Sequence, residues 1–285
     1  MKDISIEFIE YKVPDLLNPG QYLTIKGKLK LPKKNCKKRD CRNKKFPAVV
    51  ILHGSAGIDF RGEFYAQALN QSDVATLEID MWAPRGGARP QLPILTFPDA
   101  FGALAYLTFH VPSIDSQKIG VLGFSWGGVM SLAFADIAYT NQFGQGLKFA
   151  AHVANYPVCY AFNNTTVPSL PSPFDRGTQL LHLTGSPVLI QVGSEDDYDN
   201  GVENCVSLKQ TLSGSDQQLV RVKGYEGAYH AWDRLLPEEI IFDPFANEGS
   251  YFSTGEIPPV VIEPNVKQAY ESRRRVTRFF VEHLK

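Results

Sequence analysis

The chain has little of what marks a membrane protein or a nucleic-acid-binding protein. No apolar run approaches the roughly 20 residues of a membrane span, and the first eight residues lack the apolar core of a signal peptide. The formal net charge is only −1, which argues against nucleic acid or a membrane surface as a partner. A hydrophobic content of 44% and a charged content of 21% instead indicate an ordinary globular protein.

Cysteine is also scarce, with four residues in the whole chain. Cys36 and Cys41 lie in a basic segment at 32–46, which we interpret as a solvated loop at a hairpin tip. No further thiol or histidine lies close to this pair in sequence, so we expect no metal there. Cationic neighbours favour thiolates, which leaves a disulfide or a reactive dithiol open for the two residues.

Apolar patterning predicts strands that alternate with helices along most of the chain. Strand patterns cover 4–13, 22–31, 48–52, 74–79, 149–155, 188–192 and 218–222, and another strand begins at residue 118. Helical patterns cover 59–69, 98–108, 129–135, 202–212 and 265–284. This alternation favours a mostly parallel, doubly wound α/β sheet with helices on both faces. We expect one domain over 1–285, in which the proline-rich segment at about 159–187 forms a short cap or site wall.

One turn gives the strongest functional signal, the pentapeptide Gly123-Phe124-Ser125-Trp126-Gly127. It matches the G-x-S-x-G nucleophile elbow, in which a strained serine joins a strand to a helix and glycines let the turn close. The amides of the following helix then lie where an oxyanion would form. Because the pattern is common, a glycine-rich turn with an incidental serine is the alternative.

A nucleophilic serine needs a base and an acid that orients the base. The α/β-hydrolase order is serine, acid, histidine. His230 follows the last predicted strand of the sheet in a loop of turn residues, whereas His152 lies within a strand and is interpreted as a core residue. Asp196 follows the strand at 188–192 at the expected spacing, and Asp197 is the alternative acid.

Two backbone amides would complete the site as an oxyanion hole. The first expected donor is Trp126, directly after the serine. The second is Ser55 or Ala56, in the glycine-rich turn that follows the strand at 48–52. The bulky Trp82 is expected to line the cleft, with plain core packing as the alternative.

With these motifs in order, the chain resembles the dienelactone hydrolase family. The matching segments are 52–57, 80–86, 123–128, 193–197 and 227–233. The resemblance implies an α/β-hydrolase fold and hydrolysis of ester or lactone bonds in a small-molecule substrate. It also implies that no cofactor takes part, and we expect no metal at the site.

The chain departs from the founding members at the nucleophile. Those enzymes use cysteine and a nearby glutamate, whereas this chain has Ser125 and places Gly54 where the glutamate would fall. We therefore expect acyl transfer by a serine carboxylesterase rather than the namesake reaction. The alternatives are a serine peptidase or amidase of the oligopeptidase type, and a non-catalytic binding protein that retains the fold.

Two further expectations come from the resemblance. The founding enzymes hold an anionic substrate with two arginines, and Arg85 and Arg234 stand near those positions. We hypothesise that both bind a substrate carboxylate. The alternative is that Arg85 ties the turn at 84–86 and that Arg234 pairs with Asp233 or a glutamate. Some exported relatives have a disulfide that Cys159 and Cys205 would match. Together with a Cys36–Cys41 disulfide it would indicate an exported or periplasmic protein, and otherwise a cytoplasmic one.

Overall fold

The computed structural model describes residues 3–33, 45–163 and 182–285. The tip of the basic loop with Cys36 and Cys41, and most of the expected cap, lie outside the described residues. The main sheet has the strand order β1-β2-β4-β3-β5-β6-β7-β8. Its strands are β1 (Ile4–Pro14), β2 (Tyr22–Pro32), β3 (Phe46–Leu52), β4 (Ala75–Asp80), β5 (Ile114–Phe124), β6 (Ala151–Asn155), β7 (Val188–Glu195) and β8 (Val220–Tyr229).

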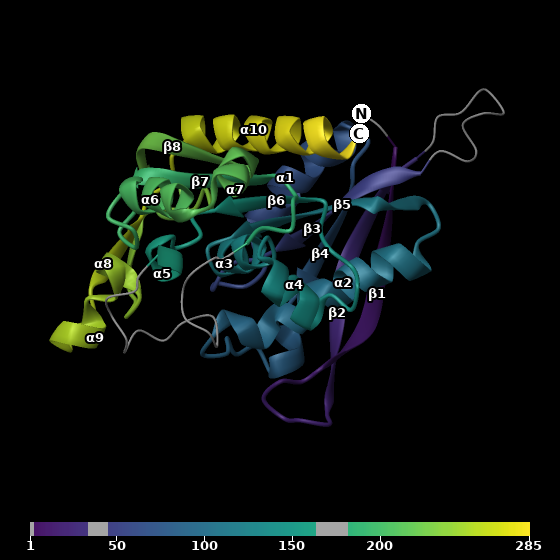
Figure 1. Cartoon of the computed structure of the whole chain (residues 1–285), viewed down its shortest axis with the longest axis horizontal. Helices are drawn as coiled ribbons and strands as arrows, with labels where there is room; N and C mark the ends of the chain where they lie inside the picture. Colours follow the sequence, from purple (N-terminus) through teal and green to yellow (C-terminus); the bar gives the residue numbers. More distant parts are fainter. Residues whose placement is uncertain (1–2, 34–44, 164–181) are drawn as a thin grey trace.

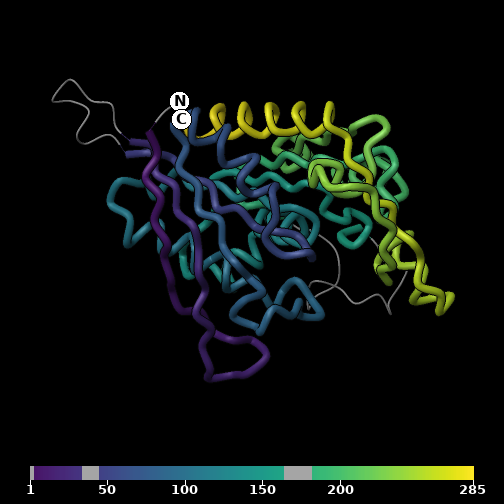
Figure 2. Tube along the Cα trace, turned by 180° about the vertical axis from the view of Figure 1, so that it is seen from behind, coloured from purple at the N-terminus to yellow at the C-terminus, as the bar shows by residue number. Residues whose placement is uncertain are grey.

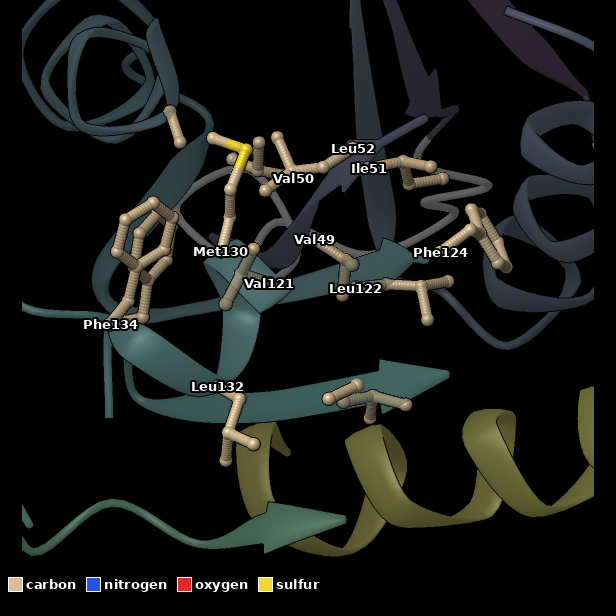
Figure 3. Packing of buried hydrophobic residues seen from close by; sticks show 14 of the residues in the cluster. Val49, Val50, Ile51, Leu52, Val121, Leu122, Phe124, Met130, Leu132 and Phe134 are labelled. Carbon is tan, nitrogen blue, oxygen red and sulfur yellow. The ribbon is translucent and has the colours of Figure 1, made fainter. Parts of the chain in front are cut away.

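The sheet is mostly parallel, as the sequence predicts. The strands from β4 to β8 pair in parallel, and only β2 runs against its neighbours β1 and β4. Every residue of β3 is buried, which explains its continuous apolar sequence. Figure 3 shows Val50 of β3 and Val121 of β5 in this core, close to Met130 of the helix that follows the serine.

Helices cover both faces of the sheet (Figure 1). On one face lie α1 (Phe60–Gln71) and α10 (Val266–Leu284), and on the other lie α2 (Phe97–His110), α3 (Trp126–Ala133) and α4 (Ile137–Phe143). The approach of α10 is close, since a Cβ on Gly120 of β5 would lie 2.6 Å from the Phe280 ring. Glycine in β5 is therefore what lets this helix reach the sheet.

The segment between β8 and α10 has structure that the sequence pattern did not predict. It forms a two-stranded antiparallel ribbon, β9 (Glu239–Phe242) with β10 (Pro259–Ile262), and between them lie α8 (Ala246–Gly249) and α9 (Tyr251–Thr254). Figure 2 shows this segment at one end of the molecule and the β1–β2 hairpin at the other. Shorter unpredicted elements are η2 (Ala83–Arg85), η3 (Pro93–Thr96), α5 (Tyr160–Asn163) and α7 (Gly214–Leu219).

The helix predicted at 202–212 is α6 (Glu203–Thr211), and the strand predicted at 218–222 continues to Tyr229 as β8. His230 therefore follows the end of this strand directly. Within the described ranges, no helix combines the length and apolar character needed to cross a membrane.

Candidate active site

Three side chains meet at one edge of the sheet, where β5, β7 and β8 end. Ser125 follows β5, Asp196 follows β7 and His230 follows β8. The Ser125 Oγ lies 2.9 Å from His230 Nε2, and His230 Nδ1 lies 2.9 Å and 3.1 Å from the two carboxylate oxygens of Asp196. Since parallel strands end at the same edge, residues far apart in sequence form one hydrogen-bonded line. This is the geometry that a nucleophile, a base and an orienting acid require.

The turn at Ser125 has a strained backbone, with φ 51° and ψ −110°. The two glycines that flank it in the pentapeptide, Gly123 and Gly127, lie where there is no room for a side chain. A Cβ on Gly123 would lie 1.8 Å from the Gly127 carbonyl oxygen, and a Cβ on Gly127 would lie 2.3 Å from that of Leu52. The glycines of the pentapeptide are thus required by the contact between β5, β3 and α3.

The two adjacent carboxylates after β7 have different partners. Asp196 is buried against His230 and also accepts the amide of Tyr198 at 3.0 Å. Asp197 accepts the amide of Val261 at 2.7 Å, so its side chain holds the β9–β10 ribbon. The structure therefore brings Asp196, and not Asp197, to His230.

The imidazole of His230 is buried between two aromatic rings that sequence reasoning missed. The ring centroids of Tyr198 and Tyr156 lie 4.3 Å and 4.8 Å from that of His230. These contacts restrict the tilt of the imidazole, whose Nδ1 is already fixed by Asp196. Because aromatic residues are abundant in the chain, no local pattern distinguishes these two.

A buried polar network holds one of these rings from behind. The Asp233 carboxylate accepts the hydroxyls of Tyr156 at 2.5 Å and Tyr65 at 2.6 Å, and Arg61 donates to the Tyr156 hydroxyl at 3.0 Å. Burial raises the pKa of Asp233, while the nearby Arg61 guanidinium opposes the shift. Asp233, the last residue of the segment at 227–233, therefore positions Tyr156 beside His230 rather than pairing with Arg234.

Of the three residues expected to provide oxyanion donors, two line the pocket beside Ser125 and one does not. Trp126 begins α3, directly after the serine, and Ser55 lines the same pocket as Ser125. The turn that carries Ser55 is close, because a Cβ on Gly54 would lie 3.5 Å from that of Ser125. Ala56 is exposed and is not among the residues that line the pocket.

The pocket beside Ser125 is mainly apolar and small, with a volume of about 60 Å³. It is lined by residues from several loops and from α3, namely Ser55, Arg89, Gln91, Leu92, Pro93, Ser125, Trp126, Val129, Val158, Ala161, Tyr198, Asp243 and Phe245. Among these described lining residues, Arg89 and Asp243 are the charged ones. The β9–β10 segment thus contributes two residues to the wall of the site.

The two arginines expected to bind an anion do not line this pocket. Arg85 donates to both oxygens of the buried Asp99, at 2.7 Å and 3.1 Å, and also to backbone carbonyls. Arg234 pairs with Glu239 and lies 3.7 Å from Asp59. Acidic neighbours hold both guanidinium groups. For Arg234 the partner is a glutamate, as the alternative had it, whereas Asp99 as the partner of Arg85 was not expected. Among the described residues that line the pocket, the cation is Arg89.

Trp82 is likewise not a lining residue. Its ring packs edge-on against Trp126 at a centroid distance of 5.5 Å, and its Nε1 donates to the Ser55 carbonyl at 3.1 Å. It therefore supports the turn beside Ser125 from behind. His53 is similarly occupied, since its Nε2 accepts the amide of Met81 at 2.9 Å and its Nδ1 lies 2.8 Å from the Gly54 carbonyl oxygen.

Cys159 and Cys205 form a disulfide between the segment after β6 and α6. Asp199 lies beside it and accepts the amides of Cys159 and Tyr160, both at 2.7 Å. These three groups, Cys159, Asp199 and Cys205, are the cluster with metal-like spacing among the described residues. A metal would need thiolates, which the disulfide does not offer. His152 is buried, as expected for a core residue, and burial lowers its pKa to about 4.

Comparisons with solved structures show what this fold resembles. Esterase 2 of Thermogutta terrifontis, solved phosphorylated by paraoxon, has a TM-score of 0.61 at 14% identity, covering 97% of this chain and 94% of that one. The dienelactone hydrolase-like promiscuous phosphotriesterase P91, from metagenomic libraries, has a TM-score of 0.55 at 15% identity, covering 98% and 99%. Est1E of Butyrivibrio proteoclasticus, with bound ferulic acid, has a TM-score of 0.58 at 14% identity, covering 96% and 98%.

At these identities the solved structures show the fold alone. No curated protein matches the chain. The family assignment comes from the sequence, since the model of the dienelactone hydrolase family matches residues 91–284, more than half of the chain. The expectation from the motifs is thereby confirmed: the chain belongs to the dienelactone hydrolase family and has its α/β-hydrolase fold.

Proposed function

We propose that the protein is a serine hydrolase that cleaves carboxylic ester or lactone bonds of small molecules. The observation that carries this proposal is the hydrogen-bonded line from Ser125 through His230 to Asp196, which opens on a mainly apolar pocket. Family membership supports hydrolase chemistry, and the serine in place of a thiol favours a carboxylesterase over the namesake reaction.

In the proposed mechanism, Ser125 Oγ attacks the acyl carbonyl while His230 Nε2 takes its proton. Asp196 holds the imidazole in the required tautomer and stabilises its protonated form. The amides of Trp126 and of the Ser55 turn stabilise the oxyanion of the tetrahedral intermediate. His230 then gives its proton to the departing alcohol, and water activated by the same histidine hydrolyses the acyl-enzyme.

The decisive experiment compares Ser125→Ala with wild type on a panel of esters, lactones and peptide amides, together with labelling by a fluorophosphonate probe. We expect wild type to cleave esters or lactones and to be labelled, and Ser125→Ala to lose roughly 10⁴-fold or more in kcat and all labelling. Ser116→Ala, a serine on the same strand, is the control and should behave as wild type.

Two other outcomes would each favour one of the alternative functions. Preferential cleavage of peptide amides would favour the oligopeptidase type. An unlabelled wild-type protein without hydrolysis would favour a binding protein that retains the fold.

A further inference from the structure

Two oppositely charged side chains face each other in the pocket wall near Ser125. Arg89 comes from the loop between η2 and η3, and Asp243 follows β9, so 154 residues of sequence separate them. The Arg89 Nη1 lies 3.6 Å from Asp243 Oδ2. Both residues line the same pocket as the serine.

The carboxylate is the fixed member of this pair. The Asp243 side chain is 9% exposed, against 36% for that of Arg89. The amide of Phe245 donates to Asp243 Oδ1 at 2.9 Å, and the neighbouring Tyr198 hydroxyl also hydrogen-bonds to Asp243. These two hydrogen bonds hold the Asp243 carboxylate in place in the pocket wall.

The guanidinium of Arg89 is directed across the pocket toward the serine side. It lies over the Trp126 ring at 5.4 Å from the centroid, and its Nη1 donates to Ser55 Oγ at 3.1 Å. Both contacted residues belong to the wall around Ser125. A cation in this place would attract a substrate carboxylate if nothing neutralised it.

The remaining lining residues that the structure describes carry no charge. Leu92, Val129, Val158 and Phe245 make most of the wall apolar. With Arg89 beside Asp243, the formal charges of the wall cancel. A substrate carboxylate brought to Arg89 would also come close to the fixed carboxylate of Asp243, and like charges at short range repel each other.

We propose that Asp243 sets the charge preference of this site. By neutralising Arg89 it makes the pocket accept uncharged esters and discriminate against esters that carry a carboxylate. This inference rests on the proposed function, and it assigns the substrate class of the same site. Asp243 is here a specificity-determining residue, with no part in the bond-breaking steps.

The test measures kcat/KM for two matched pairs of esters. The first pair, p-nitrophenyl butyrate and the p-nitrophenyl monoester of succinic acid, differs in the charge of the acyl part. The second pair, phenyl butyrate and the butyrate ester of 4-hydroxybenzoic acid, differs in the charge of the alcohol part. Wild type should prefer the neutral member of each pair.

Two variants should move this preference in opposite directions. Asp243→Asn keeps an oxygen for the Phe245 amide but releases the Arg89 charge. It should raise the anionic-to-neutral ratio of kcat/KM roughly tenfold in at least one pair, the size expected for one charge at a partly exposed site. Arg89→Gln leaves Asp243 alone and should lower the ratio. In the double variant the gain from Asp243→Asn should disappear.

Glu239→Gln is the matched control, because it removes one carboxylate from β9 that pairs with Arg234 outside the pocket. It should leave both ratios unchanged. The proposal is overturned if wild type prefers the anionic esters, if neither single variant moves either ratio, or if the gain persists without Arg89. If wild type hydrolyses neither neutral ester nor any lactone, the proposed function itself fails.

Discussion

At the scale of single residues, two adjacent side chains of the same type bind different partners. Asp196 and Asp197 both follow β7. The sequence spacing favours Asp196 as the acid but does not exclude Asp197. The choice depends on contacts with distant residues, since His230 binds the first carboxylate and the Val261 amide binds the second. Sequence order alone contains neither contact.

This division gives a test with its own control. Asp196→Asn should lower kcat roughly a thousandfold or more, because the amide cannot hold the tautomer that takes the serine proton. Asp197→Asn should keep most of the activity, because its amide oxygen still accepts the bond from the Val261 amide. Steady-state kinetics on one ester would measure both variants, and equal losses would contradict the assignment of the acid.

The partners of the arginines could not be predicted from the sequence. A cation near the β4 loop was expected, and one is present, but it is Arg89 rather than Arg85. Arg85 pairs with Asp99, a fully buried residue of α2. Motifs with a local geometric reason, such as the glycines around Ser125, could be predicted, whereas the partner of a long flexible side chain depends on the folded neighbourhood.

At the scale of elements, the strands of the core were predictable because their burial leaves a continuous apolar sequence. The β9–β10 ribbon was not predictable. Its strands have only four residues each, and neither alternates apolar with polar residues, so the sequence lacks the pattern of a half-buried strand. The ribbon is held instead from outside, through Asp197 and the amides of Asn247 and Val261.

The disulfide is an element-scale constraint near the site. It ties α6 to the segment that provides Val158 and Ala161 to the pocket wall. Its two cysteines are 46 residues apart, and closing a loop of this length stabilises a fold by up to about 4 kcal/mol in the chain-entropy model.

Replacing the pair, Cys159→Ala with Cys205→Ala, should therefore lower the free energy of unfolding by about 2–4 kcal/mol. It should also raise KM more than it lowers kcat, because it loosens the wall and leaves the serine and histidine in place. Urea unfolding and ester kinetics would measure the two effects. Wild type under reducing conditions should approach the variant, and an unchanged unfolding midpoint would count against this role.

At the scale of the whole molecule, the parallel sheet brings the three central side chains of the site together. Ser125 and His230 are 105 residues apart in sequence, and their Oγ and Nε2 atoms are only 2.9 Å apart. The alternation of strands and helices predicted this sheet, and the sheet predicts that residues after β5, β7 and β8 share an edge. The distances themselves follow from strand order and register, which no local pattern contains.

The strained turn at Ser125 also sets a limit on how stable this protein becomes. A non-glycine residue held at φ 51° and ψ −110° costs on the order of 1–3 kcal/mol. Glycine would relieve that strain, and the entropy it adds to the unfolded chain costs only about 0.5–1 kcal/mol relative to alanine. We therefore expect Ser125→Gly to melt at a higher temperature than Ser125→Ala, the reverse of the usual order.

Thermal unfolding of these two variants would measure the balance between backbone strain and unfolded-state entropy, since both variants lack the hydroxyl and its bond to His230. A Ser125→Ala protein that melts at or above the temperature of Ser125→Gly would show that the turn carries no such cost. If the order is as expected, selection for stability alone would favour glycine at this position, and the serine persists at the expense of a more robust fold.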